Sequence, residues 1–295
     1  MAPREAYALP VQLLAPHVRD LGGFQVRRVL PAFERKMVGP FIFFDHMGPI
    51  DFAPGRGMDV RPHPHIGLAT VTYLFEGAVL HRDNLGNVQR ITAGDVNWMT
   101  AGRGIAHSER TPPEERARGQ RMHGLQTWVA LPHAHEFVEP SFTHVARERL
   151  PQIERRGARL SVVAGRAFGE EAPTPTFGET LYVAAELDAS ATLTVPLEHE
   201  ERAVYVVDGD VTIDGTAVPV ANMALLDAAH DATIRARGPA RVMLVGGAKA
   251  DGDRFIWWNF VATTRGAIEQ AKEAWREQRF APIPGETEFI PLPER

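Results

Sequence analysis

Two histidines separated by a single residue stand in the run Arg61-Pro62-His63-Pro64-His65. Side chains at positions i and i+2 of an extended segment point to the same face. Both imidazoles can therefore reach one ion, each with a nitrogen about 2.1 Å from it. Because a proline favours extended geometry in the residue before it, Pro62 and Pro64 stiffen this arrangement. The run predicts one half of a metal site.

A second pair with the same spacing follows at His107-Ser108-Glu109, after a turn that contains Gly102 and Gly104. Two extended segments that each offer two ligands on one face could close a four-ligand site inside a barrel. Three neutral imidazoles and one carboxylate suit Fe, Mn, Ni, Cu or Zn, and the residue types alone do not choose among these metals. Four protein ligands on an octahedral ion leave two positions open, which is typical of a catalytic site rather than a closed structural one.

Short stretches of strand-forming residues alternate with turns along most of the chain. Residues 67–75 and 203–207 are examples, and turn sequences such as Asp208-Gly209 separate the stretches. Many short strands with regular turns between them predict a sandwich or a barrel. The strands fall into two series of similar length, with a boundary predicted near residues 133–150. We therefore predict an all-β fold with two antiparallel halves.

One segment, residues 264–279, is predicted to be helical because its apolar residues recur at spacings of three and four. Thr264 is the expected N-cap, and Pro282 and Pro284 follow the predicted end. The apolar stripe of this helix is expected to pack on a barrel. The proline-rich tail after the helix is expected to be extended.

Length and composition exclude several classes of protein. The 295 residues suffice for two domains, and the absence of cysteine excludes disulfides, zinc–thiolate sites, iron–sulfur clusters and thiol nucleophiles. The net charge of -5 offers no basic face for nucleic acid. The N-terminal residues lack the apolar core of a signal peptide, and no apolar run is long enough to cross a membrane. We therefore expect a cytoplasmic protein without a nucleic-acid or membrane partner.

Longer patterns around the two ligand pairs resemble the cupin motifs. The pattern Gly57-x5-His63-x-His65-x4-Thr70-x6-Gly77 resembles the first motif, except that Thr70 stands where cupins usually have a ligand Glu. The stretch 104–107 resembles the second motif, which leaves Glu109 to supply the carboxylate. This substitution is a hallmark of the pirin family.

The surrounding stretches are also similar to pirins, over roughly residues 20–140. The similar stretches are Phe43-Phe44-Asp45-His46, Pro62-His63-Pro64-His65, Tyr73-Leu74-Phe75-Glu76-Gly77, residues 98–105, His107-Ser108-Glu109 and residues 123–129. The stretch Trp257-Trp258-Asn259-Phe260-Val261, with the predicted helix after it, looks like bacterial pirin-like proteins.

The resemblance implies a bicupin, a pair of jelly-roll barrels with a C-terminal helix. Residues 1–135 would form an N-terminal metal-binding cupin, residues 136–260 a C-terminal cupin without metal, and residues 261–295 a helix and an extended tail packed on the barrels. The resemblance also implies one mononuclear divalent ion, Fe2+ by family precedent. Its implied ligands are His63, His65, His107 and Glu109.

The C-terminal cupin of the family has usually lost its metal, and the corresponding stretch here, residues 198–201, holds one histidine and no histidine pair. His199 and Glu201 are therefore expected to be surface residues. In the N-terminal half, His123 could orient a ligand or be an ordinary core histidine. The aromatic and apolar residues of the matching stretches are expected mainly in the core, with some lining a pocket for a flat ligand.

Several pirins resemble quercetin 2,3-dioxygenases, which open the flavonol heterocycle with O2 and release carbon monoxide. The resemblance thus implies a small, flavonol-like aromatic substrate and O2. Glu109 is our candidate for both ligand and general base, because a carboxylate can leave the metal to take a proton, whereas a bound imidazole nitrogen has no free lone pair. Two alternatives stay open: an iron-binding, redox-responsive regulator that acts through a protein partner, and a dioxygenase with another substrate.

Overall fold

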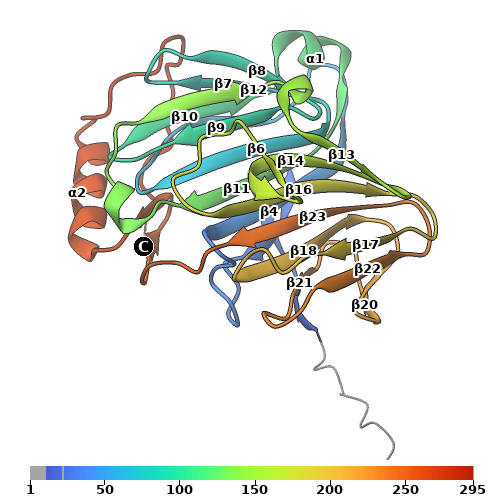
Figure 1. The fold of residues 1–295 in the computed structure, drawn as a ribbon. Helices are drawn as coiled ribbons and strands as arrows, with labels where there is room; N and C mark the ends of the chain where they lie inside the picture. Colours follow the sequence, from blue (N-terminus) through green and yellow to red (C-terminus); the bar gives the residue numbers. More distant parts are fainter. Residues whose placement is uncertain (1–10, 22, 295) are drawn as a thin grey trace, which may run out of the picture.

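The computed structural model describes residues 11–21 and 23–294. Two β-sandwich domains lie against each other, each built from one large and one small antiparallel sheet. Figure 1 shows the teal and green strands of the first domain above the orange strands of the second domain, with helix α2 (Arg265–Arg276) at the left side. The predicted all-β bicupin with a C-terminal helix is confirmed.

The first domain pairs a seven-stranded sheet with a four-stranded sheet. The seven-stranded order is β12 (Ser141–Val145), β9 (Val96–Thr100), β6 (Leu68–Glu76), β11 (Gln120–Ala130), β4 (Phe41–Phe52), β3 (Gln25–Leu30) and β2 (His17–Asp20). The four-stranded order is β5 (Asp59–His65), β10 (Ile105–Arg110), β7 (Ala78–Asp83) and β8 (Val88–Thr92). Both predicted ligand pairs therefore lie on neighbouring strands, with His107 directly opposite His63.

The second domain has the same arrangement around a core of small aliphatic side chains. Its large sheet runs β1 (Gln12–Leu14), β21 (Met223–Leu225), β18 (Glu201–Asp208), β23 (Ala240–Gly247), β16 (Thr180–Leu187), β14 (Ala158–Ala167) and β13 (Gln152–Arg155), with β15 (Glu170–Glu171) paired to β14. Its small sheet runs β17 (Thr192–Val195), β22 (Ala232–Ala236), β19 (Val211–Ile213) and β20 (Thr216–Val218).

Strand alternation gives the large sheet of the first domain two different faces. On β4, Phe43 and Asp45 line a pocket inside the first domain, whereas Phe44 and His46 contact Tyr205 on β18 of the second domain. This follows from the period of two along a strand, which sends successive side chains to opposite faces. The outward face joins a shared apolar cluster with the large sheet of the second domain. The inward face is therefore the one that can build a site.

Two strands pair with the domain on the other side of the boundary predicted between residues 135 and 136. Strand β1, at the N-terminal end of the described chain, pairs with β21 of the second domain. Strand β12, after that division, pairs with β9 of the first domain. Strand pairing thus ties the two domains together at both edges, and the boundary itself stays a prediction.

The C-terminal elements cover the first domain. After the two-stranded sheet of β24 (Phe255–Trp257) and β25 (Phe260–Ala262), Thr264 caps α2 by accepting a hydrogen bond from the backbone N–H of Ala267, as predicted. The buried face of α2 packs on Ile66 and Ala106, at the outer side of the small sheet. The sequence did not predict the short helix α1 (Pro113–Arg118), nor the 3-10 turns η1 (His133–His135) and η2 (Arg147–Arg149).

Among the described residues, no helix combines the length and the apolar character that a membrane crossing requires.

Candidate metal centre

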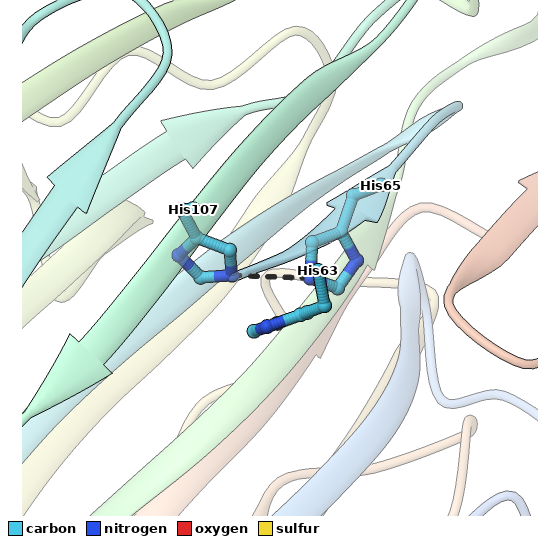
Figure 2. A group of neighbouring side chains, drawn as sticks. All are labelled: His63, His65 and His107. Atoms are coloured by element: carbon cyan, nitrogen blue, oxygen red, sulfur yellow. Dashed lines mark hydrogen bonds between the residues drawn. The ribbon is translucent and has the colours of Figure 1, made fainter. Parts of the chain in front are cut away.

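Three histidine side chains converge inside the first domain. His63, His65 and His107 are all buried, and one nitrogen of each ring lies within 4.8 Å of a nitrogen of the other two. Figure 2 shows the three rings turned toward a common centre. The Nε2 atoms of His65 and His107 are 3.2 Å apart. Two imidazole nitrogens bound at about 2.1 Å and at a right angle around one ion would lie about 3 Å apart, so the observed spacing suits a shared metal.

Backbone carbonyls orient two of these rings. The Nδ1 of His63 lies 2.9 Å from the carbonyl oxygen of Arg61, and the Nδ1 of His65 lies 3.2 Å from that of Asn259. A carbonyl can only accept, so each Nδ1 carries the proton and donates it. The Nε2 of each ring is then left with a free lone pair, which is the tautomer that binds a metal.

Burial keeps these imidazoles neutral. It is the main cause that lowers the pKa of His63 to about 4, partly offset by the hydrogen bond to Arg61. Burial likewise lowers the pKa of His65 and of His107, and the neighbouring histidines lower both further. A metal binds the neutral form of imidazole, so at neutral pH the three rings need lose no proton before they bind an ion.

Glu109 lies in the same interior but is engaged elsewhere. Its carboxylate accepts hydrogen bonds from the Thr72 hydroxyl at 3.1 Å and from the Gln126 amide at 3.4 Å, on strands of the large sheet. Among the described side chains, the group whose ligand atoms all lie within 4.8 Å of one another holds the three histidines without Glu109. Burial raises the pKa of Glu109, against the lowering effects of His81, Thr72 and Gln126.

A pocket of about 330 Å³ opens onto this interior. His63, His65 and Glu109 line it together with the aromatic side chains of Phe43 and Trp128, which stack with ring centroids 4.0 Å apart. This combination of apolar walls with a few convergent polar groups is typical of small-molecule sites.

An ion pair on β3 and β4 also lines the pocket. Arg28 donates two hydrogen bonds to Asp45, at 2.7 and 2.8 Å, and its guanidinium lies over the Phe43 ring. Burial raises the pKa of Asp45, although the hydrogen bond and the charge of Arg28 oppose this shift. The pair adds a second polar anchor point to the pocket.

Several residues of this site were not identified from the sequence. Thr72 and Gln126 hold the Glu109 carboxylate, and strand alternation alone would have placed both inside the barrel. Asn259 reaches His65 from 194 positions away in the chain. No local pattern predicts such a contact, because only the folded path of the C-terminal segment creates it.

The other residues that the sequence singled out lie partly in the pocket and partly in the core. His123 is buried, and its Nε2 lies 2.6 Å from the Nε2 of His46. Its hydrogen-bond partner is therefore His46 and not one of the three clustered histidines. Phe43 lines the pocket, whereas Phe44 and Trp98 belong to the apolar cluster between the domains. Met99 lies in the core of the first domain.

The expectation that His199 lies at the surface of the second domain was wrong. His199 is buried, with Nδ1 2.7 Å from Glu179 and Nε2 2.8 Å from the carbonyl oxygen of Arg166. Glu201 is half-buried and pairs with Arg35 of the first domain. Both nitrogens of His199 therefore face groups of the protein itself, Glu179 and the Arg166 carbonyl, so neither points at an open metal position.

Comparisons with known proteins agree with this architecture. Residues 23–129 match the family model for pirin, and residues 182–281 match the model for the pirin C-terminal cupin domain. A pirin-like protein from Caulobacter vibrioides is 47% identical over 280 residues, which cover 94% of this chain and 96% of that protein. The crystal structure of a quercetin 2,3-dioxygenase from Acinetobacter baumannii has a TM-score of 0.87 and 33% identity, and the match covers 97% of both chains.

A bacterial pirin from Escherichia coli, solved in complex with nickel(II), has a TM-score of 0.64 and 20% identity over 81% of this chain and 100% of that one. This last likeness concerns the fold alone. The two family models, the relative of matching length and the paired sandwiches lead to one conclusion: the chain belongs to the pirin family.

Proposed function

We propose that this protein is a metal-dependent oxygenase that opens a flavonol-like aromatic substrate with O2, in the manner of quercetin 2,3-dioxygenases. The observation that carries the proposal is the cluster of three neutral histidines beside a pocket with aromatic walls. The likeness to a quercetin 2,3-dioxygenase over nearly the whole chain supports the same reaction class.

His63, His65 and His107 would hold the ion, with Glu109 as the fourth ligand after its side chain turns away from Thr72 and Gln126. We propose Fe2+ as the native ion, and Mn, Ni, Cu and Zn are the alternatives that this set of ligands also suits. A divalent ion at this position would supply Lewis acidity toward a substrate hydroxyl and, for a redox-active metal, electrons toward dioxygen.

The polar side chains beside the ion have separate roles in proton transfer and in positioning. Glu109 takes the proton of the substrate hydroxyl, and its raised pKa makes it a better base than an exposed carboxylate. Thr72 and Gln126 keep the carboxylate in place while it is off the metal.

The walls and the Arg28–Asp45 pair orient the substrate. A planar ring system would lie along the apolar side formed by Phe43 and Trp128, because aromatic rings pack favourably on one another in offset-stacked or edge-to-face contacts. A second polar substituent of the substrate would meet the ion pair of Arg28 and Asp45. Burial of the pocket walls keeps bulk water away from the reacting ring.

The test loads the metal-free protein with Fe2+ under anaerobic conditions, adds quercetin and then admits air. The proposal predicts loss of the flavonol absorbance, uptake of O2 and release of carbon monoxide. Glu109→Gln should retain the fold and lose about 100-fold or more in turnover, as general-base removal does. Full turnover by this variant would refute the base role.

An iron-loaded protein that leaves quercetin and related flavonols unchanged would contradict the proposed activity. The regulator that acts through a protein partner would then be the account to pursue, by comparing the partners that the ferrous and ferric forms retain from a lysate.

A further inference from the structure

Among the described residues, no backbone carbonyl orients the ring of His107, unlike the rings of His63 and His65. Its Nδ1 lies instead 3.3 Å from the Nδ1 of a fourth buried histidine, His81. The other nitrogen of His81, Nε2, lies 3.1 Å from Oδ2 of Asp83, which is fully buried. The three side chains form a continuous line that starts at the Asp83 carboxylate and ends at the candidate metal position.

Strand β7 supplies both added residues. It pairs with β10 so that Asp83 stands opposite His107 and His81 opposite Glu109. His81-Arg82-Asp83 has the same i, i+2 spacing as the two ligand pairs, so both of its terminal side chains point into the same interior. The small sheet thus presents three such pairs side by side, on β5, β10 and β7.

Only one arrangement of protons along this line leaves His107 able to bind a metal. For its Nε2 to offer a lone pair, the proton must be on Nδ1, and the Nδ1 of His81 must then accept it. A neutral His81 that accepts at Nδ1 carries its own proton on Nε2. That proton needs an acceptor, and the Asp83 carboxylate is in position to be one.

Asp83 is itself held in a fixed orientation. Its Oδ1 accepts hydrogen bonds from the backbone N–H groups of Leu85 and Asn87, and the Asn87 amide donates to both carboxylate oxygens. Burial alone would raise the pKa of Asp83, but hydrogen bonds from His81 and Asn87 outweigh it and lower the pKa. The ring of His81 is fixed as well, because it stacks on Phe142 with ring centroids 4.3 Å apart.

We propose that His81 and Asp83 are positioning residues for the metal centre: they fix the ring and the tautomer of His107 so that its Nε2 lone pair points at the ion. The proposal rests on the metal site of the proposed function and does not depend on the substrate. Hydrogen-bonded carboxylates and carbonyls behind a ligand histidine commonly contribute about 10- to 100-fold to metal affinity.

Asp83→Asn is the sharpest test because it changes one atom. The two backbone N–H groups at Oδ1 require an oxygen there, so the new NH2 group takes the place of Oδ2 and faces His81, while the Asn87 amide turns its oxygen toward it. His81 then has to accept at Nε2 and carry its proton on Nδ1, where it opposes the proton on Nδ1 of His107. We expect Zn2+ and Ni2+ to bind about 10- to 100-fold more weakly, by calorimetry on the purified metal-free chain.

Asn87→Ala is the matched control. It removes the amide that bonds the same carboxylate, but leaves the contact between Asp83 and His81. We expect it to weaken binding of both metals clearly less than Asp83→Asn does, because the backbone N–H groups of Leu85 and Asn87 still hold Oδ1 of Asp83. If Asn87→Ala weakens binding as much as Asp83→Asn, the effect comes from the loop at residues 83–87 and the proposal is wrong.

Nitrogen-15 NMR of the histidine rings reads the tautomer directly, on the Zn2+-loaded wild type and on both variants. The proposal predicts a neutral His81 with its proton on Nε2 in the wild type and in Asn87→Ala. It predicts a proton on Nδ1 of His81 in Asp83→Asn. A wild-type His81 protonated on Nδ1 alone, or an Asp83→Asn variant with unchanged tautomer and affinity, would overturn it.

A failure of the metal site itself is recognised separately, because the wild type and Asn87→Ala would then bind neither ion. A variant that does not fold is recognised by its melting temperature. His81→Phe then serves in place of Asp83→Asn, because it keeps the stack on Phe142 and removes the acceptor for His107. Its predicted loss of affinity is of the same size, and wild-type affinity in this variant would contradict the proposal.

Discussion

At the scale of single residues, the hydrogen-bond partner of each predicted ligand fixes the orientation of that ligand in the candidate centre. A backbone carbonyl orients His63 and another orients His65, whereas Glu109 is held by Thr72 and Gln126. Each inward-pointing nitrogen therefore owes its free lone pair to a contact on the far side of its ring. Because each predicted ligand is held by its own separate contact, substitution of one of them should weaken metal binding while the protein still folds.

His65→Ala is the corresponding prediction. Loss of one imidazole should weaken Ni2+ binding by about 100-fold or more, beyond the effect of removing a group behind a ligand. Calorimetric titration of the metal-free protein measures this. His17→Ala, which removes an exposed histidine on β2, is the control and should bind as wild type does. Equal affinities in all three proteins would place the bound ion away from the histidine cluster.

The residue types and spacing were sufficient to predict the three clustered histidines, because the period of two along a strand is a local property. The contacts behind them were not predictable in the same way. Asn259 reaches His65 through the folded C-terminal segment, and Glu109 meets Thr72 across the interior. Such contacts depend on which strands face each other, and a single sequence does not contain that information directly.

At the scale of elements, the C-terminal tail is attached to the outer face of the strand that carries two predicted ligands. Glu286 accepts hydrogen bonds from the Ser108 hydroxyl and from Arg110, which alternate with His107 and Glu109 along β10. The backbone N–H of Ile290 donates to the carbonyl of Pro62 on β5. The tail therefore braces both ligand strands from behind.

Glu286→Gln should loosen this brace. Hydrogen bonds to charged groups contribute about 1.5–3 kcal/mol each, so we expect a loss of about 1–3 kcal/mol in the free energy of unfolding. Glu288→Gln is the control: Glu288 is 55% exposed and also pairs with Arg110, so its loss should be smaller. Denaturant titration of both variants measures the difference, and equal losses would contradict the bracing role.

The same carboxylate predicts a pH dependence. Hydrogen bonds from Arg110 lower the pKa of Glu286, and this effect exceeds that of burial. A group with a lowered pKa in the folded state stabilises the protein above its unfolded pKa, near 4.3, and that stability is lost as the pH falls through the folded value. The difference in stability between wild type and Glu286→Gln should therefore shrink below about pH 4. A constant difference down to pH 2 would contradict the assignment.

Sequence periodicity predicted the C-terminal helix at residues 264–279, and the structure has it at Arg265–Arg276 with the predicted cap. It missed the helix Pro113–Arg118 because six residues are too few to show an apolar period. The extended tail was predicted from its prolines. Its attachment to β10 was not, because Glu286 and Arg110 are 176 positions apart.

At the scale of the whole molecule, the two domains are joined by their large sheets and by a buried polar contact. His46 on the first domain lies 2.7 Å from the Tyr205 hydroxyl on the second, and on its other side it contacts His123. Burial lowers the pKa of His46 to about 2, with further lowering by Arg27 and His123. The contact is thus a hydrogen bond between neutral groups beside the apolar cluster that the two large sheets share.

Tyr205→Phe should destabilise the pair of domains. It removes one partner of a buried hydrogen bond and leaves a nitrogen of His46 without its partner, which costs about 1–3 kcal/mol. Tyr182→Phe is the matched control, because the equally buried hydroxyl of Tyr182 meets only that of Thr127, in a geometry too poor for a full hydrogen bond. Thermal unfolding measures both. A larger loss in Tyr182→Phe than in Tyr205→Phe would contradict this interpretation.

The sequence predicted two β-barrel halves because turns and short strands recur along the chain. It did not predict that β1 joins the sheet of the second domain, since pairing over such a distance is decided by the packing of whole sheets. No sequence pattern predicted the interface between the two domains either. Phe44 and Tyr205 look like ordinary core residues in the sequence and only the fold shows that they belong to different domains.

The central claim is that one ion binds where the three histidines converge, with Glu109 as the fourth ligand. Crystals of the metal-loaded protein, measured at the absorption edge of the bound metal, test it most directly. The account predicts a single anomalous peak about 2.0–2.2 Å from one nitrogen each of His63, His65 and His107 and from a carboxylate oxygen of Glu109. A peak that lies elsewhere, or a carboxylate still bonded to Thr72 and Gln126 beside a bound ion, would contradict it.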